Sequence, residues 1–146
     1  MRTLIVVLII CAFLQSTILP LDLVLIILIC RAFLKIGKAN LYLAFAFGLL
    51  ISHLTLIPLG LQSIGFLVLV QITQSLSRSR LSINPISLVS ICFVAIALNQ
   101  IIVWMIYGSI QFVPKIYGGF LSLAIFYLVR FWEERFIVRK EIKLKI

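Results

Sequence analysis

The sequence predicts an all-α polytopic membrane protein in which six helices cross the bilayer and both termini are cytoplasmic. The chain of 146 residues is 64% hydrophobic, with a mean hydropathy of +1.28. That is more apolar surface than a soluble domain of this size can cover with polar groups. Twelve of the 13 Lys and Arg residues lie in four clusters at alternate ends of the apolar segments. Because short loops rich in Lys and Arg stay in the cytoplasm, an even number of crossings fits this alternation and an odd number does not.

The positive residues are therefore expected on the cytoplasmic side. The four clusters are Arg2; Arg31, Lys35 and Lys38; Arg78 and Arg80; and Arg130, Arg135, Arg139, Lys140, Lys143 and Lys145. Three turns separate the clusters, near Pro20, near Pro58 and around residues 108–114. They carry only one more basic residue, Lys115. This topology, together with attraction to anionic lipid of about 1 kcal/mol per basic residue, explains the net charge of +9. We expect the lipid bilayer as a partner of these charges, and no nucleic acid.

Six apolar segments give the expected helices in chain order. They span about residues 3–19, 21–36, 40–55, 60–77, 85–107 and 116–132. A crossing of the ~30 Å hydrocarbon core needs roughly 20 residues. Pro20 ends the first segment, Gly37 suits the C-terminal cap of the second, and Asn40 is a good N-cap for the third. Arg31 interrupts the second segment, so this helix is expected to be short and tilted or to extend the Arg31 head group to the interface.

These segments define one domain and a tail. Residues 1–132 are expected to form a single six-helix transmembrane domain, followed by a basic cytoplasmic tail at 133–146. The first segment resembles a signal peptide, but the bulky stretch 11–14 offers no small-residue cleavage site, so we expect it to be retained. The tail is expected either to hold the topology as a solvated segment or to dock a partner.

Few side chains could carry out chemistry. The chain has one His (His53) and one Asp (Asp22), and its three Glu residues lie in the tail. No metal triad, carboxylate pair, nucleophile–base arrangement or phosphate-binding loop can be assembled from this set. We therefore predict that the protein is not an enzyme and needs no cofactor or metal. Asp22 is expected either to cap the second helix or to contact a partner.

Small residues recur every four positions along the third segment, at Asn40, Ala44, Gly48 and Ser52. That spacing places them on one helix face, where small side chains allow the close approach on which packing in lipid depends. Gly118 and Ser122 repeat the pattern in the sixth segment. The sequence leaves open whether these faces pack within the chain or against another chain.

Amide side chains also occur inside the apolar segments, at Asn99 and Gln100 and at Gln62, Gln71 and Gln74. An unpaired amide in hydrocarbon costs several kcal/mol, so these side chains are expected to face the interior of the bundle. There they either join helices by hydrogen bonds or line a pocket for a small ligand.

The order of several short motifs resembles the MreD family of rod-shape-determining proteins. The residues that carry the resemblance are Leu14-Gln15-Ser16-Thr17, Pro20-Leu21-Asp22-Leu23-Val24, Gly48-Leu49-Leu50 and Pro58-Leu59-Gly60-Leu61. They cover roughly residues 10–75. Two departures stand out: Leu21 separates Pro20 from Asp22, and Ser52 replaces the Asp typical of the family, so no ion pair is expected at position 52.

The resemblance implies a non-enzymatic scaffold in the bacterial inner membrane, within the machinery for lateral peptidoglycan synthesis that maintains rod shape. Its implied partners are a bitopic MreC-like protein, the actin-like MreB and the wall synthases. The resemblance also implies a helix arrangement related to the substrate-binding membrane subunits of energy-coupling-factor vitamin transporters. Such a transporter subunit is the alternative function. The single alanine in the segment 4–14, where those subunits often carry two, disfavours it.

Overall fold

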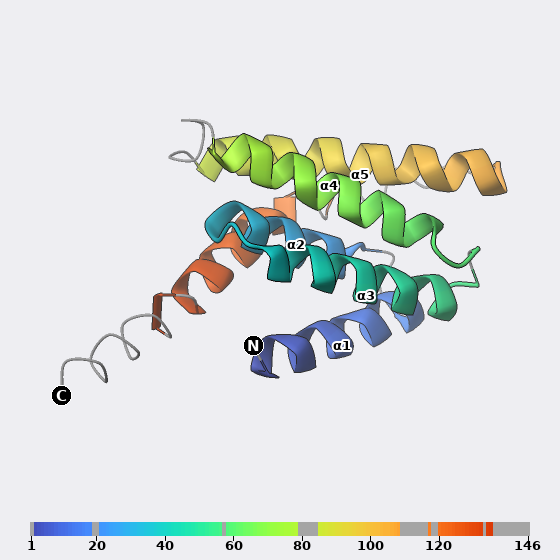
Figure 1. Cartoon of the computed structure of the whole chain (residues 1–146), viewed down its shortest axis with the longest axis horizontal. Coiled ribbons are helices and arrows are strands. Elements are labelled where there is room, and N and C mark those ends of the chain that lie inside the picture. The colour runs from blue at the N-terminus through green and yellow to red at the C-terminus, as the bar shows by residue number, and fades with distance from the viewer. Residues whose placement is uncertain are drawn as a thin grey trace.

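The computed structural model describes residues 2–18, 21–56, 58–78, 85–108, 117, 120–132 and 134–135. The helices are α1 (Arg2–Thr17), α2 (Leu23–Leu34), α3 (Lys38–Leu54), α4 (Leu61–Arg78), α5 (Pro85–Tyr107) and a further helix, Phe120–Trp132 (Figure 1). No strand occurs within these ranges. The predicted all-α fold is confirmed.

The predicted six crossings are not confirmed. In the described part of the chain, only α5 is long and apolar enough to cross a membrane by itself, over Ile86–Ile106. The helices α1, α2, α3 and Phe120–Trp132 are apolar but have 17 residues or fewer. With a rise of 1.5 Å per residue, the 12 residues of α2 extend only about 18 Å, against a hydrocarbon core of ~30 Å.

The expected caps between α2 and α3 are wrong. Lys35, in an extended conformation, is the C-cap of α2, and Gly37 instead precedes the first residue of α3. Asn40 lies inside the first turn of α3, where its side-chain amide donates to the carbonyl of Lys35 at 2.6 Å. The short connection is thus held by a contact back to α2, which local cap preferences do not predict.

All described Lys and Arg residues lie at one end of the bundle, which we call the basic end. Here α1 begins, α2 ends, α3 begins, α4 ends and Phe120–Trp132 ends, at the left of Figure 1. The basic residues of these helix ends are Arg2, Arg31, Lys35, Lys38, Arg78, Arg130 and Arg135. The opposite end carries Asp22 at the start of α2, and the turn between α3 and α4.

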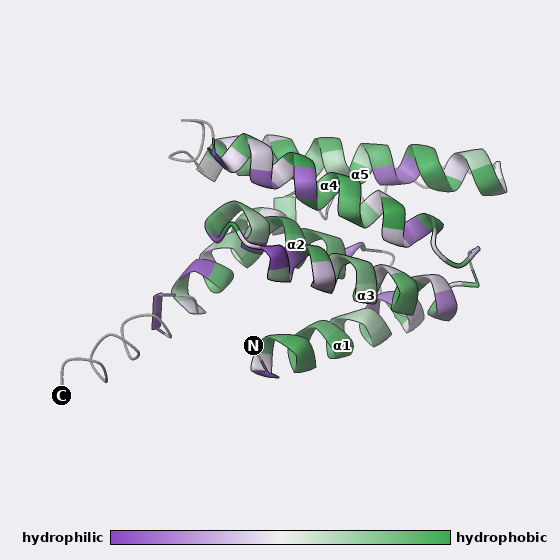
Figure 2. Ribbon diagram, in the orientation of Figure 1, coloured by the Kyte–Doolittle hydropathy of each residue, from purple (hydrophilic) through white to green (hydrophobic). Residues whose placement is uncertain are grey.

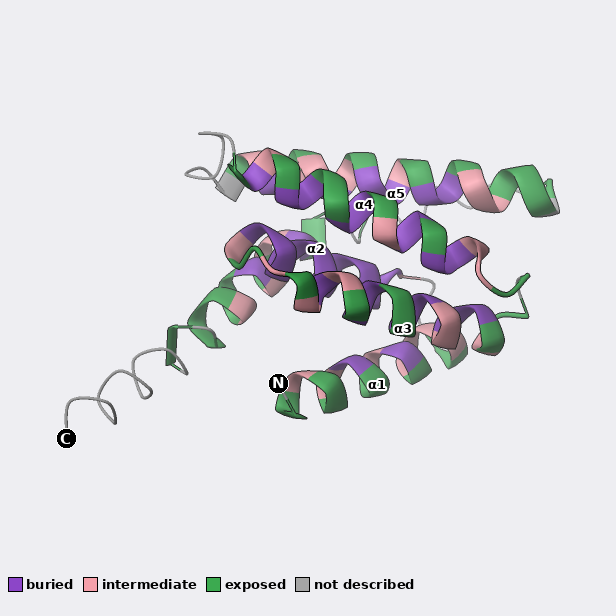
Figure 3. Cartoon of the chain, in the orientation of Figure 1, coloured by how far each residue is buried: buried purple, intermediate pink, exposed green. Residues whose placement is uncertain are grey.

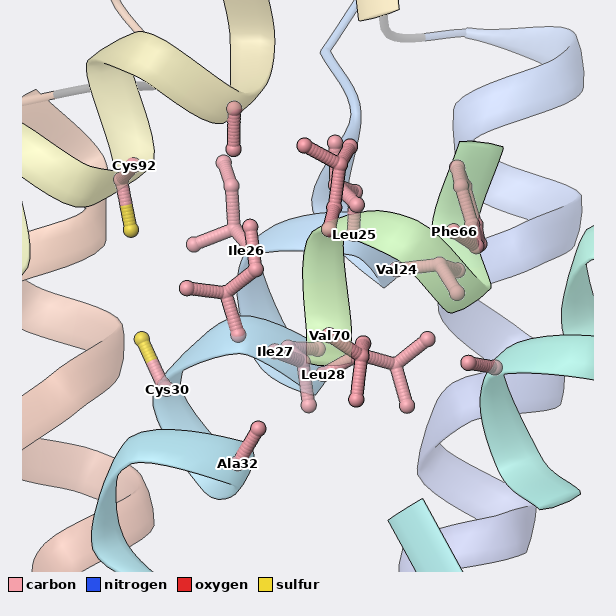
Figure 4. Close-up of a cluster of buried hydrophobic side chains, with 14 of the residues drawn as sticks. Val24, Leu25, Ile26, Ile27, Leu28, Cys30, Ala32, Phe66, Val70 and Cys92 are labelled. Carbon is pink, nitrogen blue, oxygen red and sulfur yellow. The ribbon is translucent and has the colours of Figure 1, made fainter. Parts of the chain in front are cut away.

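The short helix α2 forms the centre of the core. Its residues from Val24 to Phe33 are all buried, because α1, α3, α4 and α5 pack around it. Figure 4 shows side chains of α2 meeting Phe66 and Val70 of α4. The most extensive contact between two helices joins α3 to α4.

Candidate functional site

The bundle has a partly polar interior and an apolar exterior. Its buried polar or charged residues are Asp22, Arg31, Asn40, Ser52, Gln62, Ser63, Thr73, Gln74, Ser77, Asn99, Gln100 and Ser122. Large apolar side chains are exposed on every described helix except α2, including Val6, Phe45, Val68 and Val94. Hydrophobic residues accordingly run along the full length of each helix in Figure 2, and exposed positions mark the outer faces in Figure 3. Soluble monomers rarely expose apolar surface so widely.

A network of four polar side chains, Gln15, Asp22, Gln62 and Asn99, lies toward the opposite end and is our candidate site. We call it the Asp22 network. The amide of Gln15 donates to Asp22 Oδ1 at 3.1 Å, and Asn99 Nδ2 donates to Asp22 Oδ2 at 3.2 Å. Gln62 Nε2 donates to Asn99 Oδ1 at 3.0 Å. The network therefore links α1, the start of α2, α4 and α5, with Asp22 6% and Asn99 1% exposed.

The carboxylate of Asp22 sets the direction of the bonds around it. Asn99 turns its NH₂ group toward Asp22, whose carboxyl oxygens accept, and its oxygen toward Gln62. Gln62 must then donate to Asn99. This leaves Gln62 Oε1 buried with no hydrogen-bond partner among the described residues, as is Gln100 Nε2 on the neighbouring position of α5. The network thus has one spare buried acceptor, and Gln100, outside the network, has a spare buried donor.

The predicted position of Asp22 at the start of α2 is confirmed, but the residue does not cap the helix by a side-chain hydrogen bond. Instead Gln15 Oε1 accepts from the backbone N–H of Val24 in the first turn of α2, at 3.3 Å. Gln15 therefore bonds to both Asp22 and α2, which leaves Asp22 Oδ2 to bind Asn99.

The small-residue face of α3 packs inside the chain. Asn40, Ala44, Gly48 and Ser52 are all buried, and at Gly48 the backbones of α3 and α4 nearly touch. A Cβ at Gly48 would lie 2.5 Å from the Cα of Ser63. Because a Cβ cannot lie so close to a backbone atom, only glycine fits at position 48.

A second group of hydrogen bonds lies at the basic end, and we call it the backbone clamp. Gln74 Nε2 donates to the carbonyl of Gly37 at 3.0 Å, and Ser77 Oγ donates to the carbonyl of Phe33 at 2.7 Å. One bond runs from α4 to the connection between α2 and α3, and the other runs from α4 to the end of α2. Phe33 lies in the last turn of α2, whose carbonyls lack partners within the helix.

The remaining predicted residues are scattered. Ser122 is buried, and its carbonyl lies 3.8 Å from Cys30 Sγ. Pro58 and Gly60 lie in the turn between α3 and α4, where Gly60 has a φ of +96°, and His53 is exposed. Pro20, Gly118 and the tail from residue 136 lie outside the described residues.

Sequence reasoning missed Ser63, Thr73 and Ser77 of α4. Together with Gln62 and Gln74 they are buried. Ser63 is 11 residues before Gln74 and 14 before Ser77, close to three and four turns of a 3.6-residue helix, and this periodicity was the signal that could have found them.

Cys30 and Cys92 turn their sulfur atoms toward each other in the core (Figure 4). Both residues are completely buried, and neither is in a disulfide.

Within the described ranges, no three His, Cys, Asp or Glu side chains gather to hold a metal ion. Comparisons with known protein families, with curated proteins and with solved structures found no match.

Proposed function

We propose that this protein is a non-enzymatic, multi-pass scaffold of the bacterial inner membrane that binds an MreC-like protein within the machinery for lateral wall growth. The observation that carries the proposal is the combination of an apolar exterior with a hydrogen-bonded polar interior. In lipid, helices gain little from apolar burial against one another and associate through close packing and polar contacts. Such a bundle offers its outer faces to other membrane helices.

The family resemblance supports the same function at residue level. Gln15 and Asp22 belong to two separate motifs of that resemblance, and they form a hydrogen bond with each other. Gly48 belongs to a third motif and provides the close approach of α3 to α4. The motif residues thus hold the helices of the bundle together, as expected of a scaffold that acts by binding partners and not by catalysis.

The charge distribution supports a membrane orientation with both termini in the cytoplasm. The described Lys and Arg residues share the basic end, as the preference of positive loops for the cytoplasm requires. Helices shorter than the bilayer core can still cross it where the bilayer thins locally or long basic side chains reach the headgroups. Arg2, Lys38 and Arg78 lie at helix ends, where they can do so.

Copurification with the MreC-like protein of the same organism tests the function. In mild detergent, the tagged chain should enrich that protein about tenfold over an unrelated six-span protein, equivalent to about 1.4 kcal/mol of binding preference. Equal recovery by the two tagged proteins would count against the scaffold.

Site-directed labelling tests the topology separately. In a background without Cys11, Cys30 and Cys92, cysteines placed at Lys35 and at Leu56 should react from opposite sides of the membrane. Both positions are exposed, so accessibility depends on the side and not on burial. Labelling of both from the same side would refute the proposed arrangement.

The vitamin-transporter subunit remains the second candidate because of two buried atoms. Gln62 Oε1 and Gln100 Nε2 could bind a small polar ligand. A vitamin that raises the melting temperature of the wild-type chain, but not of Gln100→Leu, would favour this candidate over the scaffold.

A further inference from the structure

An apolar groove of about 430 Å³ lies between α1, α2 and the helix Phe120–Trp132. Leu4, Val7 and Cys11 line it from one face of α1, Ile27 lines it from α2, and Ile125 and Trp132 line it from the third helix. No network or clamp residue borders it. We propose that this groove binds one acyl chain of an anionic phospholipid, whose phosphate group contacts the arginines at the basic end. This proposal rests on the membrane placement proposed above.

The volume of the groove suits a hydrocarbon chain and is too small to enclose a whole helix. One leaflet of hydrocarbon is about 15 Å deep, half of the ~30 Å core, so about 430 Å³ spread over that depth has a cross-section of about 29 Å². A helix with its side chains is about 10–12 Å across and needs about 80–110 Å². A transmembrane segment of a partner could place single side chains in the groove, but its body would remain outside.

The charges at the mouth favour an anionic headgroup. The start of α1 and the end of Phe120–Trp132 both lie at the basic end (Figure 1), which brings Arg2 and Arg135 to the same end as the groove residues Leu4 and Trp132. The guanidinium carbon of Arg135 lies 4.9 Å from the ring centre of Phe131, which itself lines the groove. Arg130 is paired with Glu134 at 2.9 Å. Arg2 and Arg135 are exposed and can bind a phosphate near the membrane surface.

The acyl chain and the phosphate would thus be recognised by different parts of one site. The apolar walls of α1 and Phe120–Trp132 hold the chain, and the arginines at the rim select the headgroup. Trp132 lies where these parts meet, at the depth that Trp side chains prefer in a bilayer.

Native mass spectrometry of the full-length chain, purified in mild detergent and exchanged into equal amounts of phosphatidylglycerol and phosphatidylcholine, tests the proposal. We expect one retained phosphatidylglycerol per chain. Val7→Trp fills the groove and should reduce this retention about tenfold, or about 1.4 kcal/mol. Ile64→Trp places the same bulk on an exposed position of α4 and should leave it unchanged. Ile125→Trp is the second groove variant should Val7→Trp fail to fold, as judged by circular dichroism.

The headgroup is tested by Arg2→Gln combined with Arg135→Gln. This variant should retain the two lipids equally, because the chain-binding walls are intact while the phosphate contacts are lost. Equal retention of both lipids by the wild type would overturn the proposal, as would the same lipid content in Val7→Trp and Ile64→Trp. Weaker recovery of the MreC-like protein by Val7→Trp, with unchanged lipid, would assign the groove to a partner helix instead. Loss of lipid from Val7→Trp with normal recovery of that protein supports the lipid site. Retention of phosphatidylglycerol by a wild-type chain that does not recover the MreC-like protein would count against the scaffold and not against the lipid site.

Discussion

The two ends of the bundle are held together by different kinds of hydrogen bond. In the Asp22 network, side chains bind one another across α1, α2, α4 and α5. In the backbone clamp, side chains of α4 bind carbonyl groups at the end of α2 and in the turn that follows it. A carbonyl is present whatever residue supplies it, whereas each bond of the network needs two particular side chains. The network therefore depends on specific residues, and the clamp depends mainly on where the helices end.

The largest expected effect comes from Asn99→Leu, because Asn99 joins the two halves of the network. The substitution removes one donor from the Asp22 carboxylate and the only described acceptor of Gln62 Nε2. Leaving buried polar groups without these bonds should lower the free energy of unfolding by about 3 kcal/mol. The midpoint of thermal unfolding in detergent, followed by circular dichroism, measures the loss.

A triple variant sharpens this test. Replacing Asp22, Gln62 and Asn99 together by Leu removes the buried polar groups of the network instead of orphaning them and leaves only the half-buried Gln15, and such replacements are often neutral. The triple variant should recover most of the stability lost in Asn99→Leu. A triple variant that is as unstable as the single one would show that the bonds themselves, and not the unpaired groups, set the stability. One that folds but no longer recovers the MreC-like protein would give the network a direct role in binding.

Gly48→Ala should have an intermediate effect near the same end. The added Cβ would clash with backbone atoms of Ser63. The clash can be relieved only if α3 and α4 move apart, because the nearest atom belongs to the backbone and not to a flexible side chain. Overpacking of this kind should cost about 2 kcal/mol, measured by the same melting experiment.

Gly65→Ala is the matched control on α4. A Cβ there lies 3.2 Å from Ile102 Cδ1, the flexible end of a side chain. Its small clash is offset by the better helix propensity of Ala, worth up to about 1 kcal/mol. If the two alanine variants melt at the same temperature, the close approach of α3 to α4 is not what restricts position 48.

Ser77→Ala, in the clamp, should have the smallest effect. It removes one hydrogen bond to the Phe33 carbonyl and should cost about 1 kcal/mol. Ser90→Ala is its control, because Ser90 is exposed and, among the described residues, bonds within its own helix, to the carbonyl of Ile86 at 3.4 Å. A loss for Ser77→Ala as large as that for Asn99→Leu would erase the distinction between the two ends.

Periodicity within a segment predicted the parts of this fold that depend on one helix. The spacing of Asn40, Ala44, Gly48 and Ser52 indicated a packed face, and all four residues are buried. Of the amides expected to face the interior, Gln62, Gln74, Asn99 and Gln100 are buried. The prediction is wrong for Gln71, which is exposed on the outer face of α4.

The partners of these residues could not be predicted in the same way. Asp22 and Asn99 are 77 positions apart, and only the packing of α5 beside α2 brings them together. The ends of α2 and α3 were misplaced for a related reason: contacts from α4 and from Asn40 fix the turn around Gly37, and no local preference encodes them.

The enclosed position of α2 has a consequence for biosynthesis. This helix leaves the ribosome long before α4 and α5, the helices that later cover it. At about 5–20 residues per second, roughly 4–15 seconds pass between the completion of α2 and that of α5. Throughout that interval α2, a 12-residue helix with Arg31 in its last turn, lacks the cover that α4 and α5 give it in the complete bundle and has only α1 and α3 of this chain to pack against.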